Sequence, residues 1–151
     1  MPGKKKSDLK IHNNTYFESC IEIVESWLAS KDYELLYETG AQDGIYYSIR
    51  QIILNSRNHA EKRLYVLLHE CGHLLINSTK RDRVFALSRS TEAVMGNKTT
   101  RKRRVAVLSE EIEAWKRGER LAKRLGIDIN EEKFDKIRAD AIISYVEWAR
   151  D

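Results

Sequence analysis

The sequence predicts a small α+β domain, and three observations support this prediction. The chain has 151 residues, of which 42% are hydrophobic, enough for one compact core. Four segments carry apolar residues at spacings of three and four, which is typical of amphipathic helices. Two short segments rich in Tyr, Ile and Leu lie after the first helical segment and favour β-strands. The predicted architecture is a short antiparallel sheet packed against one helix, with three further helices completing the core.

The first third of the chain predicts an arm, a helix and two strands. Residues 1–14 are rich in Lys and Asn and are expected to form a flexible basic arm before a single domain over residues 15–151. The periodicity predicts a helix over residues 16–30. Two antiparallel strands follow, one in YELLYETG and one over residues 45–54, joined by the turn ETGAQDG.

The remainder predicts three helices and one long loop. A helix is expected over residues 60–76, followed by a mobile basic loop over about residues 78–106. A helix is predicted to begin at Ser109, whose side chain can cap it, and to run to residue 125. Glu110 and Glu111 would give this helix an acidic first turn, which suits the helix dipole. A last helix is predicted over residues 131–150, with Phe134, Ile137, Ala141, Ile142, Tyr145 and Trp148 facing inward.

Composition and charge limit the classes of function. The net charge is +4 and the sequence pI is about 9.0, partly from the runs Lys4 to Lys6 and Arg101 to Arg104, so nucleic acid is a possible partner. No apolar stretch reaches the roughly 18 residues of a membrane span, and no apolar core follows the basic N-terminus as in a signal peptide. The two cysteines, Cys20 and Cys71, do not form a disulfide framework. We therefore expect a cytoplasmic protein with no membrane partner.

The chemistry of the chain is concentrated in one motif of the 60–76 helix. The run YVLLHECGHLLI contains His69, Glu70 and His73 in a His-Glu-x-x-His pattern. Residues four apart lie on one helix face, so His69 and His73 can bind the same metal ion. Zinc lowers the pKa of a bound water toward neutrality, and Glu70 can accept the proton of that zinc-bound water.

A third protein ligand is expected from the helix that follows the loop. A catalytic zinc site usually has three protein ligands and one open position. The segment SEEIEAWKRGERLA offers Glu110, Glu111 and Glu113, and their positions in the sequence do not choose between them. The remaining histidines, His12 and His59, are expected to be ordinary surface residues.

A resemblance to a known family rests on these segments together. The run IYYSIRQIILN, then EKRLYVLLHECGHLLI, then EEIEAWKRGERLA resembles the ImmA/IrrE-type metallopeptidases, in the gluzincin branch of the zincin fold. The resemblance implies a zincin-like fold and places the third ligand at Glu111, because the ligand Glu of that family precedes an Ala by three and Ala114 matches this Ala. The sequence departs from the family pattern at Trp115, where Asn or Asp is usual, and at Cys71, where Leu or Ile is common.

The predicted function is therefore zinc-dependent hydrolysis of peptide bonds in an intracellular protein substrate, with Glu70 as general base. A strand around Tyr46 to Leu54 could pair with an extended substrate. One alternative is a nucleic-acid-associated binding or regulatory protein with a zincin-like fold and little peptidase activity. A structural or assembly protein is a second alternative. The short chain would suit a phage or mobile-element product.

Overall fold

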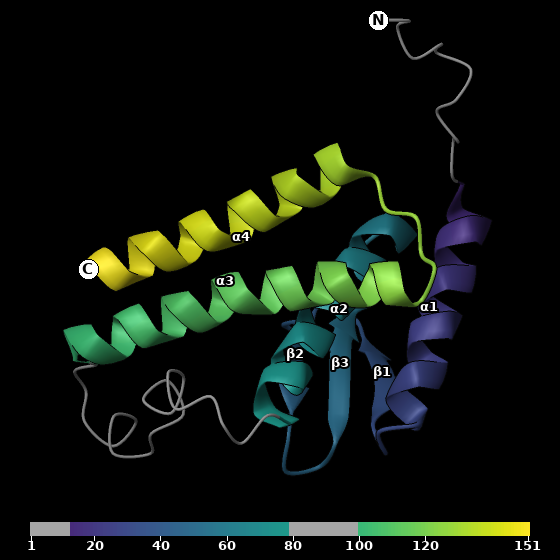
Figure 1. Ribbon diagram of the computed structural model, residues 1–151, viewed down its shortest axis with the longest axis horizontal. Coiled ribbons are helices and arrows are strands. Elements are labelled where there is room, and N and C mark those ends of the chain that lie inside the picture. The colour runs from purple at the N-terminus through teal and green to yellow at the C-terminus, as the bar shows by residue number, and fades with distance from the viewer. Residues whose placement is uncertain (1–12, 79–99) are drawn as a thin grey trace, which may run out of the picture.

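The part of the chain that the structure describes forms four helices and one small sheet (Figure 1). A computed structural model describes residues 13–78 and 100–151. The elements, in chain order, are α1 (Asn14–Ala29), β1 (Glu34–Glu38), β2 (Gly44–Tyr46), β3 (Gln51–Asn55), α2 (Ala60–Ser78), α3 (Arg101–Arg124) and α4 (Glu131–Arg150). The predicted α+β class is confirmed. No helix within the described ranges is long and apolar enough to cross a membrane.

The sheet is mixed, and the predicted antiparallel pairing of the YELLYETG strand with the 45–54 segment was wrong. The strand order is β1-β3-β2, in which β1 pairs with β3 in parallel and β2 pairs with β3 in antiparallel orientation. The strand predicted over residues 45–54 is two strands, because the chain turns at residues 47–50 and Arg50 adopts a left-handed φ of 54°. This run contains no Gly or Pro, the usual sequence signals of a turn.

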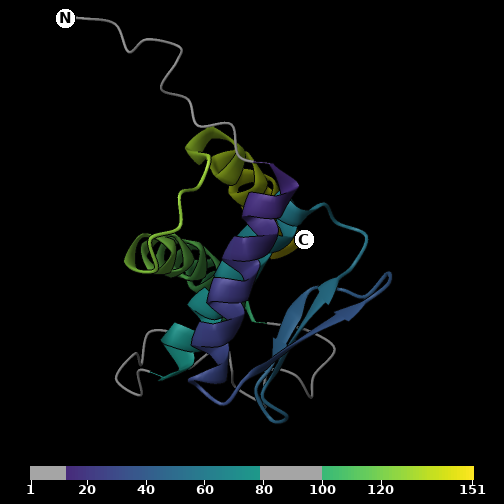
Figure 2. The same ribbon diagram turned by 90° about the vertical axis from the view of Figure 1, so that its right-hand side faces the viewer.

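The core is built around α2, which lies between the sheet and the other long helices. In Figure 2, the sheet lies on one side of the molecule, with α3 and α4 on the other. From the sheet, Leu35, Ile52 and Leu54 are buried in the same cluster as the apolar face of α1. Because α2 contacts α1, the sheet and α3, nearly every residue of its middle turns is buried, including His69 and Glu70. Burying such polar groups is costly unless they have partners.

Helix α3 begins earlier than predicted. Its N-cap is Thr100, whose side chain accepts a hydrogen bond from the backbone N–H of Arg103 at 3.1 Å. The predicted cap, Ser109, lies inside the helix and donates its hydroxyl to the Val105 carbonyl at 2.8 Å. Residues 101–106 are therefore helical rather than part of the predicted loop. The rest of that loop, from 79 to 99, and residues 1–12 of the predicted arm lie outside the described residues.

Helix α4 has the predicted bounds and packs along α3 (Figure 1). Its N-cap, Asn130, accepts a hydrogen bond from the Lys133 backbone N–H at 3.1 Å. Phe134 is its one fully buried residue, and Trp148, which was predicted to face inward, is 38% exposed. The C-terminal half of α4 runs alongside α3 (Figure 1), and Ile143 and Val146 in this half are exposed together with Trp148.

Candidate metal centre

Two glycines let α2 and α3 cross at close range and so bring the site together. A Cβ atom at Gly72 would overlap the backbone carbonyl group of Ala114, and one at Gly118 would overlap the carbonyl of Leu68. Gly72 lies inside the His-Glu-x-x-His motif and Gly118 lies two turns beyond Glu111, so the contact spans the site. Glycine in a helix interior usually weakens the helix. At position 118 it is needed because no side chain fits at this crossing.

The crossing places one carboxylate against both motif histidines. Oε2 of Glu111 lies 3.1 Å from Nε2 of His69, and Oε1 of Glu111 lies 3.0 Å from Nε2 of His73. The three potential ligand atoms all lie within 4.8 Å of one another. A single ion placed among them would meet two imidazole nitrogens and one carboxylate oxygen.

The other two acids of the SEEIEAW segment take different positions. Oε1 of Glu110 lies 3.4 Å from Nδ1 of His73, on the opposite side of that ring from Glu111. Glu113 forms an ion pair with Arg117 at 3.1 Å and lines none of the cavities around the histidines. The geometry thus separates three candidates that the sequence left open: Glu111 faces both histidines and Glu110 supports one of them.

Charges in the centre are strongly coupled. Burial by itself lowers the pKa of His73, but hydrogen bonds to Glu110 and Glu111 outweigh it and raise the pKa to about 10. Burial would raise the pKa of Glu111, and the two neighbouring histidines instead lower it to about 2. Without a metal, His73 and Glu111 therefore form a buried ion pair. The positive charge of protonated His73 then balances the Glu111 carboxylate, as a bound metal ion would do.

His69 contacts Glu111 through Nε2, and its ring stacks on a tryptophan. The Trp115 ring stacks on the imidazole, with centroids 4.4 Å apart and planes 21° apart. Nδ1 of His69 is buried and has no hydrogen-bond partner among the residues that the structure describes. Oε2 of Glu111 is also buried without a hydrogen bond of acceptable geometry. A buried carboxylate oxygen that lies close to an imidazole nitrogen without a well-directed hydrogen bond fits a divalent metal ion.

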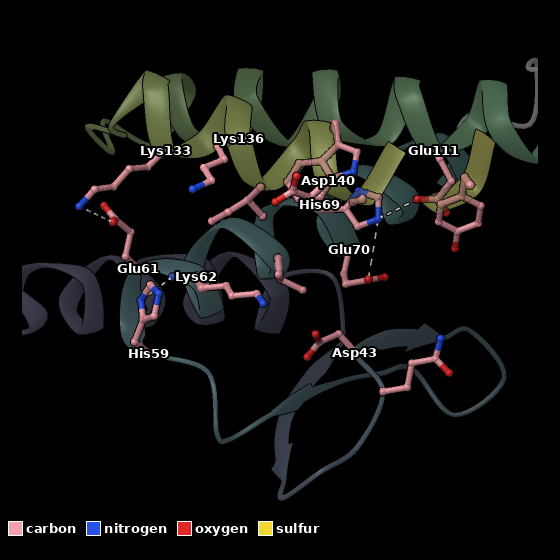
Figure 3. Close-up of a pocket in the computed structure, with 16 residues that line it drawn as sticks. Asp43, His59, Glu61, Lys62, His69, Glu70, Glu111, Lys133, Lys136 and Asp140 are labelled. Carbon is pink, nitrogen blue, oxygen red and sulfur yellow. Dashed lines mark hydrogen bonds and ion pairs between the residues drawn. The ribbon is translucent and has the colours of Figure 1, made fainter. Parts of the chain in front are cut away.

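Glu70 lies beside this cluster with its carboxylate directed toward the cleft. Figure 3 shows His69 between Glu111 and Glu70, and Oε1 of Glu70 lies 3.9 Å from Nε2 of His69. Burial raises the pKa of Glu70, and His69 and His73 partly oppose this shift. A buried carboxylate with a raised pKa next to a metal centre has the properties of a general base.

The centre opens on two cavities. One, of about 590 Å³, extends toward the start of α4 and contains the labelled lysines of Figure 3. The other, of about 340 Å³, extends toward β2 and the start of α3. Both are lined by Asp43, His69, Glu70, Glu111 and Tyr145. A cleft therefore runs past the metal centre on both sides, as the binding of a polymeric substrate requires.

A comparison with protein families agrees with this geometry. Residues 20–106 match the peptidase M78 family, described as the IrrE N-terminal-like domain, which is more than half of the chain. The chain belongs to the peptidase M78 family. This confirms the resemblance to ImmA/IrrE-type metallopeptidases. No curated protein and no solved structure matches the chain significantly.

The M78 match and the structure contribute different parts of the site. The matched region contains His69, Glu70 and His73 but ends before Glu111, so the case for the third ligand comes from the fold. His59 is exposed, and its Nδ1 accepts a hydrogen bond from the Lys62 backbone N–H at 3.3 Å, at the start of α2. His12 lies outside the described residues.

Sequence reasoning missed two residues of the cleft in this M78 domain. Tyr145 was predicted only as an inward-facing residue of the last helix, yet it lines both cavities, and burial followed by the negative charge of Glu111 raises its pKa. Asp43 was assigned to a turn, and it too lines both cavities. No pattern in the sequence marks either residue, because the packing of α4 and of the loop before β2 positions them.

Proposed function

We propose that this M78 protein is a zinc-dependent peptidase that hydrolyses peptide bonds of an intracellular protein substrate, with Glu70 as general base. The observation that supports this most is the convergence of His69, His73 and Glu111 beside the buried carboxylate of Glu70 in an open cleft. Two imidazoles and one carboxylate form a ligand set that zinc prefers, with a fourth position left for water or substrate. Both cysteines are buried and free, which suits a reducing compartment.

The residues of the centre have two roles in the proposed hydrolysis, metal binding and proton transfer. Zinc, when bound, supplies a Lewis acid that polarises the scissile carbonyl and lowers the pKa of an attacking water. His69, His73 and Glu111 would hold the ion. Glu70 takes a proton from the attacking water and passes it to the leaving amine, and its raised pKa favours the first of these transfers.

The sheet limits where an extended substrate could bind. β3 is paired on both sides, so most of the segment Tyr46–Leu54 cannot accept another strand, contrary to the prediction. Within residues 13–78 and 100–151, no strand pairs with the edge of β2 that faces away from β3, and Gly44 and Ile45 line the smaller cavity. We propose that the substrate adds to the edge of β2, next to the metal centre, by backbone hydrogen bonds.

Substitution of the base tests this function. Zinc-loaded wild type should cleave peptides from a denatured protein or a peptide mixture, and Glu70→Gln should lower the rate by about 10² to 10⁴, because the attacking water loses its proton acceptor. Glu113→Gln, which alters an acid outside the cleft, should cleave as the wild type does. Product peptides are counted by mass spectrometry, with zinc content measured on the same samples. Equal cleavage by wild type and Glu70→Gln at equal zinc content would refute the proposed role.

A second candidate function, nucleic-acid binding, is favoured by one surface. A hollow at the ends of α2 and α3 is lined mainly by cations, namely Arg117, Arg120, Lys123 and Arg124. Arg120 and Lys123 have 66% exposed side chains, which suits contact with phosphates. If this surface binds nucleic acid, the affinity for a DNA or RNA duplex falls steeply with added salt, and Arg120→Glu with Lys123→Glu abolishes binding. Affinity that is unaffected by either change would exclude this function.

A further inference from the structure

The smaller cavity of the cleft contains a single arginine. Its lining residues come from the β2 region, from α2, from the first turns of α3 and from Tyr145 of α4. Among the described residues that line it, Arg103 is the one Lys or Arg. Arg103 lies in the first turn of α3, seven residues before Glu110 on the same side of the helix.

The acids of this cavity already have partners. Asp43 accepts a hydrogen bond from the Asn55 backbone N–H at 2.6 Å. Glu110 contacts His73, and Glu111 contacts both histidines. Glu70 lies against His69 in the position of the general base. Each carboxylate therefore contacts a motif histidine or a backbone N–H, and none forms an ion pair with Arg103 in the described structure.

One donor of the Arg103 side chain has no acceptor within the described part of the chain. Its Nε–H is buried and donates to no atom there, whereas its backbone N–H donates to the side chain of Thr100. A buried guanidinium N–H without an acceptor is unfavourable by itself and is satisfied when an anion binds. Its planar fork of donors matches a carboxylate in a bidentate arrangement.

The position of Arg103 separates it from the metal ligands. Seven residues of helix correspond to a rise of about 10 Å, and Val107 lies between Arg103 and Glu110 on the cavity wall. An extended peptide advances about 3.3 Å per residue, so Arg103 lies within about three residues of a bond that is cleaved at the metal centre.

We propose that Arg103 is a specificity-determining residue that binds a carboxylate of the peptide substrate within about three residues of the scissile bond. The carboxylate belongs either to an Asp or Glu side chain or to the C-terminus of the substrate. This inference rests on the proposed peptidase function, since it places a substrate in the cleft. The guanidinium adds binding energy on one side of the metal centre and fixes the register of the substrate.

Selection of peptides by a protein that does not cleave them tests the proposal. Zinc-loaded Glu70→Gln is immobilised and exposed to a random peptide library in two forms, one with free and one with amidated C-termini. Bound peptides are then sequenced. The same selection is performed with Glu70→Gln/Arg103→Gln, with Glu70→Gln/Arg103→Glu, and with Glu70→Gln/Lys102→Glu as the matched control. Lys102 is exposed in the same turn and does not line the cavity.

With Glu70→Gln, we expect about tenfold enrichment of acidic residues at one position of the bound peptides. This enrichment should be lost when Arg103→Gln is added and unchanged when Lys102→Glu is added. With Arg103→Glu, basic residues should be enriched instead. Enrichment in the amidated library identifies a side-chain carboxylate, and enrichment limited to free C-termini identifies the terminal carboxylate. The same peptide profile with and without Arg103, or no acidic enrichment at all, would overturn the proposal. Acidic selection that depends on Arg103, without cleavage by wild type, would instead refute the peptidase function and leave the Arg103 site standing.

Discussion

At the scale of single residues, the contact between Glu110 and His73 supports one ligand of the proposed metal centre. Oε1 of Glu110 lies 3.4 Å from Nδ1 of His73, which leaves Nε2 directed at Glu111. A carboxylate in this position fixes the ring orientation and raises the basicity of a ligand histidine. Glu110→Ala should therefore weaken zinc binding about 10- to 100-fold, and Glu110→Gln, which keeps an acceptor oxygen, should weaken it less.

The measurement for this prediction is a zinc titration in competition with a chromophoric chelator. Glu113→Ala is the control, because Glu113 lies on the same helix but pairs with Arg117 away from the centre. Wild-type affinity in Glu110→Ala would show that Glu110 has no positioning role.

The coupled charges predict how zinc affinity depends on pH. Glu110 and Glu111 overcome the effect of burial and raise the pKa of His73 from 6.5 to about 10, so the metal-free protein holds a proton that zinc must displace. Apparent zinc affinity should rise about tenfold per pH unit between pH 6 and 8. In the metal-free protein, the same shift stabilises the fold fully below pH 6.5, and this contribution is lost as the pH rises toward about 10.

Zinc titrations at pH 6, 7 and 8 check this dependence, with ionic strength held constant. His59→Asn serves as a control, since His59 is exposed and lies outside the metal cluster. A flat affinity across this range would mean that His73 is already neutral in the metal-free protein.

The sequence predicted the motif residues well because their relation is local. Residues 69 and 73 lie on one helix face in any α-helix, so their convergence does not depend on the rest of the fold. The assignment of Glu111 does depend on the rest of the fold. Glu110, Glu111 and Glu113 point in different directions around the axis of α3, and the crossing with α2 determines which of them contacts the histidines. Arg103 was placed in a loop, so its position in the cleft was not predictable.

At the scale of elements, the close crossing of α2 and α3 positions the site. Gly→Ala in a helix interior usually stabilises the helix by up to about 1 kcal/mol. At Gly72 the added methyl group would overlap the carbonyl of Ala114 and force the helices apart. We expect Gly72→Ala to lower the free energy of unfolding by about 1–3 kcal/mol and to weaken zinc binding, because Glu111 would move away from the histidines.

Denaturant unfolding and zinc titration of the same variant test the role of the crossing. Gly44→Ala is a suitable control for stability, since a Cβ there would meet its nearest neighbours at an ordinary 3.7 Å. A Gly72→Ala protein as stable as the wild type would show that the helices can separate without cost.

Elements were predicted with unequal success for identifiable reasons. The bounds of α4 were predicted because Asn130 and the acidic first turn mark its start. The start of α3 was missed because RKRR was assigned to a solvated loop, although Thr100 provides a cap. The sheet was predicted with two strands because residues 45–54 form one nearly continuous apolar run. The turn at residues 47–50 within this run contains no Gly or Pro that would indicate it.

At the scale of the whole molecule, the proposed metal joins parts that are distant in the sequence. His69 and His73 belong to α2, Glu111 belongs to α3, and the residues between these helices lie mostly outside the described chain. Because zinc would bind the folded protein and not the unfolded chain, it should stabilise the whole domain by mass action. The pattern of apolar residues predicted the α+β class, and the length of the chain predicted a single compact domain. It could not predict the cleft, which α4 and the β2 edge form only when the chain is folded.

The central claim is that His69, His73 and Glu111 together hold one zinc ion. Elemental analysis of purified wild type, His73→Ala, Glu111→Ala and Glu113→Ala tests it most directly, after each protein is supplied with zinc and desalted. We predict about one zinc per chain in wild type and Glu113→Ala, and loss of zinc in His73→Ala and Glu111→Ala. Zinc retained by Glu111→Ala would contradict the assigned ligand set, and a wild type that binds no zinc would contradict the metal centre itself.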